Sequence, residues 1–332
     1  MTTVSMTRAL VTGGAGFIGS HLVDALLAAR HSVTVLDDLS TGKHEWLYRP
    51  DSEPRYRAVL GSVTDDALVH ELVAQHDIVY HLAAAVGVRN VVADPLGSMI
   101  TNVRGTELVL AAAAAARRPV VLASTSEIYG KSTAYPFRED GERVLGPTWV
   151  HRWSYSSSKA IDEHLAFAYG DRGLPVAVLR YFNAYGPRID ERGYGSVIAR
   201  FASQALAGTP LTVHGDGKQT RCFTYVADTV RGTMAAARAV LAGRTGVYNI
   251  GASQEISIEE LAHLVRDMLG SSSPIERVPY ESFYGPGFED TRRRVPDTSR
   301  AEKELGFRAQ ITLREGLSTT LAWCRSNYSS HK

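Results

Sequence analysis

The sequence predicts a doubly wound parallel α/β sheet followed by a smaller C-terminal domain. Short apolar segments alternate with segments of helical period over the first half of the chain, which is typical of parallel strands joined by helices. A glycine-rich turn, 13–19, joins the first strand to the first helix. After residue 183 the alternation stops, and Gly, Pro and charged residues become dense in 186–195 and 285–296. These stretches predict a smaller, irregular domain over the carboxyl edge of the sheet.

The individual elements follow from local patterns. Each expected strand is a short apolar run bounded by Gly, Pro or polar residues. These runs are 9–12, 32–36, 56–60, 77–82, 120–123, 176–181 and 246–250. The expected helices 18–29, 95–117 and 155–169 have apolar residues at helical spacing, and alanines, which favour helix, fill 111–116.

Composition excludes several classes of protein. Of the 332 residues, 44% are hydrophobic and 21% charged, so the chain can bury a core and is not disordered. A formal net charge of +1 implies no general attraction to nucleic acid or to a membrane surface. No apolar run reaches the ~18 residues of a membrane span, and the N-terminus lacks a signal-peptide pattern. Because Cys222 and Cys324 form no metal or redox motif and no disulfide framework, we expect a cytoplasmic protein. The eleven histidines lack metal-ligand spacing, so we expect no catalytic metal.

The first motif is a phosphate-binding turn. Gly13, Gly16 and Gly19 have G-x-x-G-x-x-G spacing between a strand and a helix. Such glycines let the backbone approach a pyrophosphate, and the helix N-terminus offers N–H groups and a positive dipole end. Asp37 ends the second strand, where a carboxylate hydrogen-bonds the adenosine ribose and repels a 2′-phosphate. The pattern predicts NAD rather than NADP.

The second motif is a candidate acid–base pair. Tyr155 and Lys159 are four residues apart in an expected helix, so they share one face. Tyrosine acts as a base near neutrality only if its pKa falls from about 10, and an adjacent ammonium group and a positive nicotinamide would lower it. Thr125 ends the fifth strand, at the sheet edge where ligands bind. The group predicts proton removal from an alcohol while hydride leaves its carbon.

With these motifs, the sequence resembles the extended short-chain dehydrogenase/reductase family of NAD-dependent nucleotide-sugar epimerases, dehydratases and decarboxylases. The segments that carry the resemblance are GGAGFIGSH (13–21), LDDLSTG (36–42), HLAA (81–84), STSEIYG (124–130), YSSSK (155–159), RYFNAYGPR (180–188) and TRCFTYVAD (220–228). They span nearly the whole chain. The resemblance implies a Rossmann domain over 1–184, to which the chain returns around 223–253. A nucleotide-sugar-binding domain would be formed by 185–222 and 254–332.

The resemblance also implies site residues. Tyr155 would be the acid/base and Lys159 its partner, with Thr125, Ser126 and Glu127 at the reacting sugar. The residues expected to contact NAD are Gly13, Gly16, Phe17, Ile18, Gly19, Asp37, Leu82, Ala83, Ala84, Asn102, Tyr155 and Lys159. Those expected to contact a UDP-sugar are Arg89, Thr125, Ser126, Asn183, Arg221 and Arg294. The family further implies a homodimer in which 95–117 and 155–169 form a four-helix bundle.

The tripeptide Thr125-Ser126-Glu127 favours one reaction within the family. Sugar 4,6-dehydratases have an Asp-Glu pair here, and galactose-type 4-epimerases usually have a small or hydroxyl residue in place of Glu127. Thr-Ser-Glu, together with RWSY (152–155), GPRID (186–190) and Arg294 in an R-x-P segment, resembles UDP-glucuronate decarboxylases. C4 oxidation of a hexuronate places its carboxylate β to a ketone, and hydroxyl groups can stabilise the enolate left by loss of CO₂. We therefore expect a UDP-glucuronate decarboxylase that yields a UDP-pentose.

Several alternatives stay open. Glu127 is either a group that acts on the substrate carboxylate or on C5, or a structural carboxylate paired with an arginine. The segment VGVRNV (86–91) looks more like hexuronate 4-epimerases, in which Arg89 would hold a carboxylate or diphosphate; otherwise Arg89 is a solvated loop residue. A UDP-glucose/UDP-glucuronate 4-epimerase is thus the alternative reaction. An NAD(H)-binding regulatory module without turnover is a more distant one. Arg292 and Arg293 either bind the diphosphate or lie in a solvated basic loop.

Overall fold

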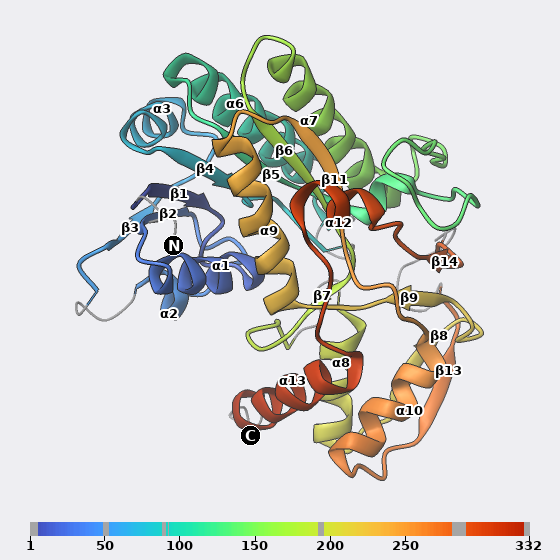
Figure 1. The fold of residues 1–332 in the computed structure, drawn as a ribbon. Helices are drawn as coiled ribbons and strands as arrows, with labels where there is room; N and C mark the ends of the chain where they lie inside the picture. Colours follow the sequence, from blue (N-terminus) through green and yellow to red (C-terminus); the bar gives the residue numbers. More distant parts are fainter. Residues whose placement is uncertain are drawn as a thin grey trace.

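The computed structural model describes residues 6–48, 53–87, 91, 93–191, 196–280 and 290–328. Its centre is a seven-stranded parallel sheet in the order β11-β6-β5-β4-β1-β2-β3 (Figure 1). The strands are β1 (Arg8–Thr12), β2 (Ser32–Asp37), β3 (Tyr56–Leu60), β4 (Ile78–His81), β5 (Val120–Thr125), β6 (Val176–Tyr181) and β11 (Gly246–Ile250). All seven expected strands are present, and the predicted doubly wound fold is confirmed. The chain reverses its direction of travel across the sheet between β1 and β4, and such a switch point forms a ligand crevice at the carboxyl edge.

Two apolar layers hold helices against the two faces of this sheet (Figure 1). One face carries α1 (Phe17–Ala28), α9 (Val226–Leu241) and α12 (Ser299–Leu305); the other carries α3 (Asp66–Gln75), α6 (Gly105–Ala116) and α7 (Ser154–Gly170). Because both faces are covered, the strands are apolar throughout rather than alternating. This explains why short apolar runs in the sequence located them.

The helix expected over 95–117 is interrupted. It consists of α5 (Pro95–Met99), the π-helical turn η1 (Ile100–Arg104) and α6. Asn102 lies within this turn, and its side-chain oxygen accepts a hydrogen bond from the backbone N–H of Ala85 at 2.7 Å. A π-turn inserts an extra residue per turn and commonly occurs near functional sites. Here it directs an amide group at the segment that follows β4.

The C-terminal part, which lies mainly in the lower half of Figure 1, has its own apolar cluster. The cluster is formed mainly by α8 (Val197–Ala207), α10 (Ile258–Leu269) and α13 (Leu313–Asn327). Short strands lie beside it: β8 (Leu211–His214) pairs with β13 (Ile275–Val278), and β9 (Thr220–Cys222) lies between β12 (Glu255–Ser257) and β14 (Arg293–Arg294). Residues 223–253 return to the large sheet, where they form its strand β11 and the helix α9 that packs on one of its faces. The domain boundaries at 184, 222 and 254 stay a prediction.

The remaining elements are short. They are α2 (His44–Leu47), the 3-10 turns η2 (Ser126–Tyr129) and η3 (His151–Trp153), and the paired strands β7 (Ala184–Tyr185) and β10 (Thr224–Tyr225). Among the residues described, no helix is both long and apolar enough to cross a membrane.

Candidate active site

The turn after β1 is shaped by its glycines. Gly13 has φ +71°, and a Cβ atom there would lie 2.6 Å from the backbone nitrogen of Ala83. A Cβ on Gly19 would lie 2.1 Å from the carbonyl oxygen of Gly13. Both positions therefore require glycine. Gly16 is the N-cap residue of α1, and no side chain makes a capping hydrogen bond there, so the first-turn N–H groups of Phe17 and Ile18 have no side-chain cap.

Asp37 lies at the carboxyl end of β2, beside this turn. Its carboxylate accepts hydrogen bonds from the backbone N–H groups of Ala15 and Leu39, both at 2.9 Å. Burial raises the pKa of Asp37, and these two N–H groups oppose that effect. The carboxylate is thus tied to the glycine turn while it still lines the adjoining pocket.

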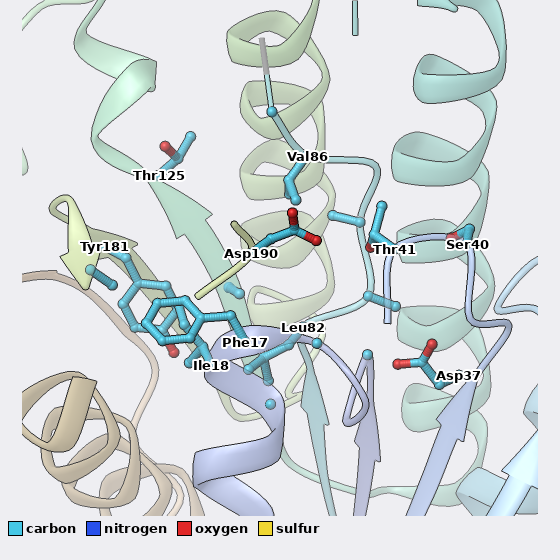
Figure 2. Close-up of a pocket in the computed structure, with 18 of the residues that line it drawn as sticks. Phe17, Ile18, Asp37, Ser40, Thr41, Leu82, Val86, Thr125, Tyr181 and Asp190 are labelled. Carbon is cyan, nitrogen blue, oxygen red and sulfur yellow. The ribbon is translucent and has the colours of Figure 1, made fainter. Parts of the chain in front are cut away.

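One pocket of about 400 Å³ connects the glycine turn to the end of β5. Figure 2 shows Asp37 at one end, Thr125 at the other, and Phe17, Ile18 and Leu82 between them. The predicted site residues that line this pocket are Gly13, Gly16, Phe17, Ile18, Gly19, Asp37, Leu82, Ala83, Ala84, Thr125, Ser126, Glu127, Tyr155, Lys159, Asn183 and Arg294. The structure therefore brings most of the predicted cofactor and substrate residues to one elongated pocket.

The predicted acid–base group lies where β5 meets α7. The hydroxyl of Tyr155 shares a hydrogen bond with Thr125. The ammonium group of Lys159 donates to the carbonyl oxygen of Ala123 at 3.1 Å and is 3.1 Å from the carboxylate of Asp162. Lys159 and Asp162 are both buried, with side-chain exposures of 3% and 0%.

The pKa of Tyr155 is shifted opposite to the direction expected from Lys159 alone. Burial, the carboxylate of Glu127 and the carboxylate of Asp162 all raise it, and only the hydrogen bond to Thr125 lowers it. Burial is the largest cause, and the effect expected from Lys159 is offset because Asp162 pairs with its ammonium group. A cation in the pocket, such as an oxidised nicotinamide ring, would favour the phenolate.

Glu127 lies between two arginines. Its carboxylate is 2.7 Å from Arg294 and 2.6 Å from Arg152, and all three side chains are largely buried. Burial alone would raise the pKa of Glu127, but the two guanidinium groups outweigh it and lower the pKa to about 2. Glu127 is therefore ionised at neutral pH, and two guanidinium charges against one carboxylate leave this end of the pocket positive.

Two predicted site residues lie elsewhere. Asn102 is buried, and its amide bonds the backbone of Ala85 and the hydroxyl of Ser158 instead of lining the pocket. Arg221 pairs with Asp290 at 2.8 Å and also lies outside the pocket lining. Arg89, predicted to contact the sugar nucleotide, lies outside the described residues.

The neighbouring basic residues Arg292 and Arg293 do not line the pocket either. Arg292 pairs with Asp216 at 2.8 Å, and Arg293 pairs with Glu255 at 2.9 Å. Both side chains are exposed at the surface, in agreement with the solvated-loop interpretation.

Two residues with a place in this site were not assigned one from the sequence. Arg152 was noted only as part of the RWSY segment, although it binds Glu127. Its contact depends on η3 folding back toward η2, which no local pattern reveals. Asp162 was visible as the residue three positions after Lys159, a spacing that brings side chains together on a helix. Its complete burial is what distinguishes it from an ordinary surface pair.

Comparison with known proteins gives consistent matches over most of the chain. Residues 9–251 match the model of the NAD dependent epimerase/dehydratase family. The chain is 43% identical to UDP-N-acetyl-alpha-D-glucosaminuronate decarboxylase from Bacillus cytotoxicus, over 96% of this chain and 98% of that protein. It is 35% identical to UDP-glucuronic acid decarboxylase 1 from Xenopus tropicalis, over 96% of this chain and 72% of that protein. The solved structure of dTDP-glucose 4,6-dehydratase from Streptomyces venezuelae, with NAD bound, superposes with a TM-score of 0.86 at 34% identity, covering 97% of this chain and 98% of that one.

Proposed function

This chain belongs to the NAD dependent epimerase/dehydratase family, and we propose that it oxidises C4 of a UDP-hexuronate and then decarboxylates the product. The resemblance to this family seen in the sequence is confirmed. The observation that carries the proposed reaction is the Arg152–Glu127–Arg294 group at the sugar end of the pocket. Its net positive charge suits a substrate with a carboxylate. Two relatives of this chain are decarboxylases of UDP-linked uronates by name.

NAD is the cofactor of the family, and the pocket fits it. The glycine turn leaves room for a diphosphate beside the N-terminus of α1, which attracts anions. Gly13, Gly16, Phe17 and Ile18 would hold the diphosphate, Asp37 the adenosine ribose, and Lys159 the nicotinamide ribose. When bound, NAD⁺ accepts a hydride from the sugar carbon and later returns it.

The side chains at the end of β5 handle the accompanying proton. The Tyr155 phenolate takes the proton of the C4 hydroxyl, and Thr125 hydrogen-bonds the same oxygen. After oxidation the C5–C6 bond breaks, CO₂ leaves, and the electron pair of that bond forms an enolate on the C4 oxygen. Tyr155, now protonated, and Thr125 donate hydrogen bonds to that oxygen where its negative charge develops. A proton taken up from solvent then adds to C5 before the ketone is reduced.

The low pKa of Glu127 argues against a role as proton donor. With a pKa of about 2, this carboxylate holds no proton to give at neutral pH. Its position instead suits it to orient Arg152 and Arg294 and to repel a carboxylate that lies near it. Such repulsion raises the energy of the carboxylate ground state relative to CO₂.

Incubation of the purified protein with UDP-glucuronate, and separately with UDP-N-acetylglucosaminuronate, tests the proposal. Mass spectrometry should find a product lighter by the mass of CO₂ with at least one of them. An isobaric product would mean 4-epimerisation and would overturn the proposed reaction. No turnover of either uronate or of UDP-glucose would favour an NAD(H)-binding regulatory module. Homodimer formation and a cytoplasmic location stay predictions.

A further inference from the structure

A buried polar chain leads away from the ion pair of Lys159 and Asp162. The side chain of Thr106, on α6, faces the carboxylate of Asp162 and favours its charged form, without a hydrogen bond of regular geometry between them. The hydroxyl oxygen of Thr106 is also 3.1 Å from Nε2 of His81, at the end of β4. Nδ1 of His81 is 2.7 Å from the hydroxyl of Thr12, at the end of β1. Thr106 and Thr12 have no exposed surface, and His81 is 1% exposed.

The chain reaches the wall of the glycine turn. The hydroxyl oxygen of Thr12 accepts a hydrogen bond from the backbone N–H of Ala83 at 3.2 Å. Ala83 is the residue that any side chain at position 13 would strike. The region between the cofactor turn and Lys159 thus holds four polar side chains. Each comes from a different element, namely β1, β4, α6 and α7.

The chemistry of Asp162 sets the direction of every hydrogen bond in this chain. Burial raises the pKa of Asp162, and the ammonium group of Lys159 at 3.1 Å opposes that effect and favours the carboxylate. Because a carboxylate attracts protons and cannot donate one, the Thr106 hydroxyl turns its proton toward Asp162. The Thr106 oxygen is then free to accept from Nε2–H of His81. Burial and the nearby charge of Lys159 lower the pKa of His81 to about 3, so the ring is neutral and carries one proton. With that proton on Nε2, Nδ1 accepts from the Thr12 hydroxyl, whose oxygen accepts from Ala83.

We propose that Asp162 is a positioning residue for Lys159, and that the chain Thr12–His81–Thr106–Asp162 aligns the ammonium group with the wall of the cofactor turn. This inference rests on the proposed use of Tyr155 and Lys159 in C4 oxidation, and it is independent of whether CO₂ is lost afterwards. Asp162 acts through Lys159 and does not line the pocket. Complete burial of an unpaired carboxylate costs free energy, so the charge of Asp162 depends on its ion pair with Lys159.

Asp162 also contributes to the electrostatic environment of the base. The charged groups that face Tyr155 are Glu127 on η2 and Asp162 on α7, and Glu127 is itself bound by Arg152 and Arg294. Those that face Asp162 are Lys159 and Glu163 on the same helix, while neutral His81 lies on β4. Because both carboxylates raise the pKa of Tyr155, removal of the Asp162 charge should lower that pKa.

The first test compares Asp162→Asn with Asp171→Asn in the NAD-loaded protein. Both changes remove one carboxylate from the same helix region, but Asp171 is exposed at its end. NADH formation is followed at 340 nm against pH, with whichever sugar nucleotide the wild type oxidises. Asp162→Asn should lower turnover by about 10- to 100-fold because Lys159 loses its alignment. Oxidation needs the Tyr155 phenolate, so the rate of NADH formation falls as the pH drops below the pKa of Tyr155. In Asp162→Asn this acidic limb of the pH–rate profile should move to lower pH by roughly 0.5 to 1 unit.

Asp171→Asn should leave both the rate and the limb unchanged. The proposal would be overturned if Asp162→Asn only lowered the melting temperature. In that case turnover would stay within twofold of wild type, the acidic limb of the pH–rate profile would not move, and the role of Asp162 would be purely structural.

The second test needs neither turnover nor a stable Asp162 variant. The ¹⁵N resonances of His81, assigned by their loss in His81→Gln, report which ring nitrogen holds the proton. The wild type should show the Nε2–H tautomer, unchanged between pH 6 and 8. Thr106→Val, which removes the hydroxyl at nearly constant shape, should lose that single tautomer. An Nδ1–H tautomer in the wild type would overturn the chain's direction. If these results hold but no CO₂ is released, only the proposed reaction fails.

Discussion

The side chain of Arg294 donates a hydrogen bond to the carboxylate of Glu127 at 2.7 Å, across 167 positions of the sequence. This contact joins η2, which follows β5 of the central sheet, to β14 of the C-terminal part. Arg152 binds the other carboxylate oxygen from η3. The two interpretations of Glu127 left open by the sequence therefore meet in one arrangement: it is a paired carboxylate, and the pair lies at the pocket.

Replacement of Glu127 by Gln tests its part in the step after oxidation. The variant keeps the shape of the side chain but loses the charge that holds both arginines and repels the substrate carboxylate. We expect loss of CO₂ or protonation at C5 to slow more than oxidation at C4. A 4-keto species and NADH should then accumulate, visible near 340 nm.

A matched control for that variant is Glu255→Gln. Glu255 also pairs with an arginine, Arg293, but away from the pocket lining. It should turn over like the wild type without NADH accumulation. Equal slowing of oxidation and decarboxylation in Glu127→Gln would mean that Glu127 only supports the structure.

Replacement of Tyr155 by Phe tests the base. The ring stays and the hydroxyl that hydrogen-bonds Thr125 is lost. Turnover should fall by at least about 10²-fold, the usual size of a general acid–base contribution, while NAD stays bound. Single-turnover NADH formation and extraction of the bound nucleotide measure the two quantities. Tyr48→Phe, on a half-exposed tyrosine outside the pocket, should behave as wild type; near wild-type turnover in Tyr155→Phe would rule out this base.

Local sequence patterns were sufficient to predict the strands of the central sheet and the cofactor turn. Strands covered on both faces are short apolar runs, and the glycine turn lies between two such recognisable elements. The π-turn at η1 was not predictable, because its residues fit a continuous helical pattern as well as they fit the observed one. The interruption matters, since it places Asn102 against the backbone of Ala85 rather than in the pocket.

The ion pairs in the site depend on tertiary contacts, so they could not be predicted from the sequence. Arg152, Glu127 and Arg294 come from three separate elements, and only the folded chain shows that they share one carboxylate. The shift of the Tyr155 pKa has the same origin. Sequence spacing revealed the nearby ammonium group of Lys159, but the burial of Asp162, which compensates that charge, appears only in the structure.

Gly13→Ala should weaken NAD binding and the fold together. The added methyl group would meet the nitrogen of Ala83 at 2.6 Å, and φ +71° is unfavourable for alanine. The control Gly208→Ala has nearly the same backbone strain, φ +70°, with no atom within 4 Å of the new methyl group. We expect Gly208→Ala to lower the free energy of unfolding by about 1 kcal/mol and to keep NAD. Gly13→Ala should lose more stability and copurify with little NAD; normal NAD content would contradict this account of the turn.

The expected homodimer has a candidate surface in the structure. Leu96 and Ile100, on α5 and η1, are 71% and 52% exposed, and Ile161 on α7 is 40% exposed. These residues lie on the helices predicted to form a four-helix bundle. Light scattering at micromolar concentration should give twice the monomer mass for the wild type. The double variant Leu96→Glu/Ile161→Glu should be monomeric, whereas Leu241→Glu, at an exposed position on α9, should not change the mass. A monomeric wild type would contradict the prediction.

The selectivity for a uronate is tested by Arg294→Ala, because Arg294 is the member of the arginine pair that lines the pocket. Binding is measured by calorimetry in the NAD-loaded Tyr155→Phe background, so that no turnover occurs. A charge-assisted hydrogen bond contributes about 1.5–3 kcal/mol, so the affinity for UDP-glucuronate should fall roughly 10- to 100-fold. The affinity for UDP-glucose, which has no carboxylate, should change much less. Arg293→Ala alters the preceding residue, whose side chain is exposed and paired with Glu255, and it should leave both affinities unchanged. An equal loss of affinity for both sugars in Arg294→Ala would mean that this arginine supports the pocket but does not bind the substrate carboxylate. Selectivity for the uronate would then have to come from Arg152, the other arginine that binds Glu127.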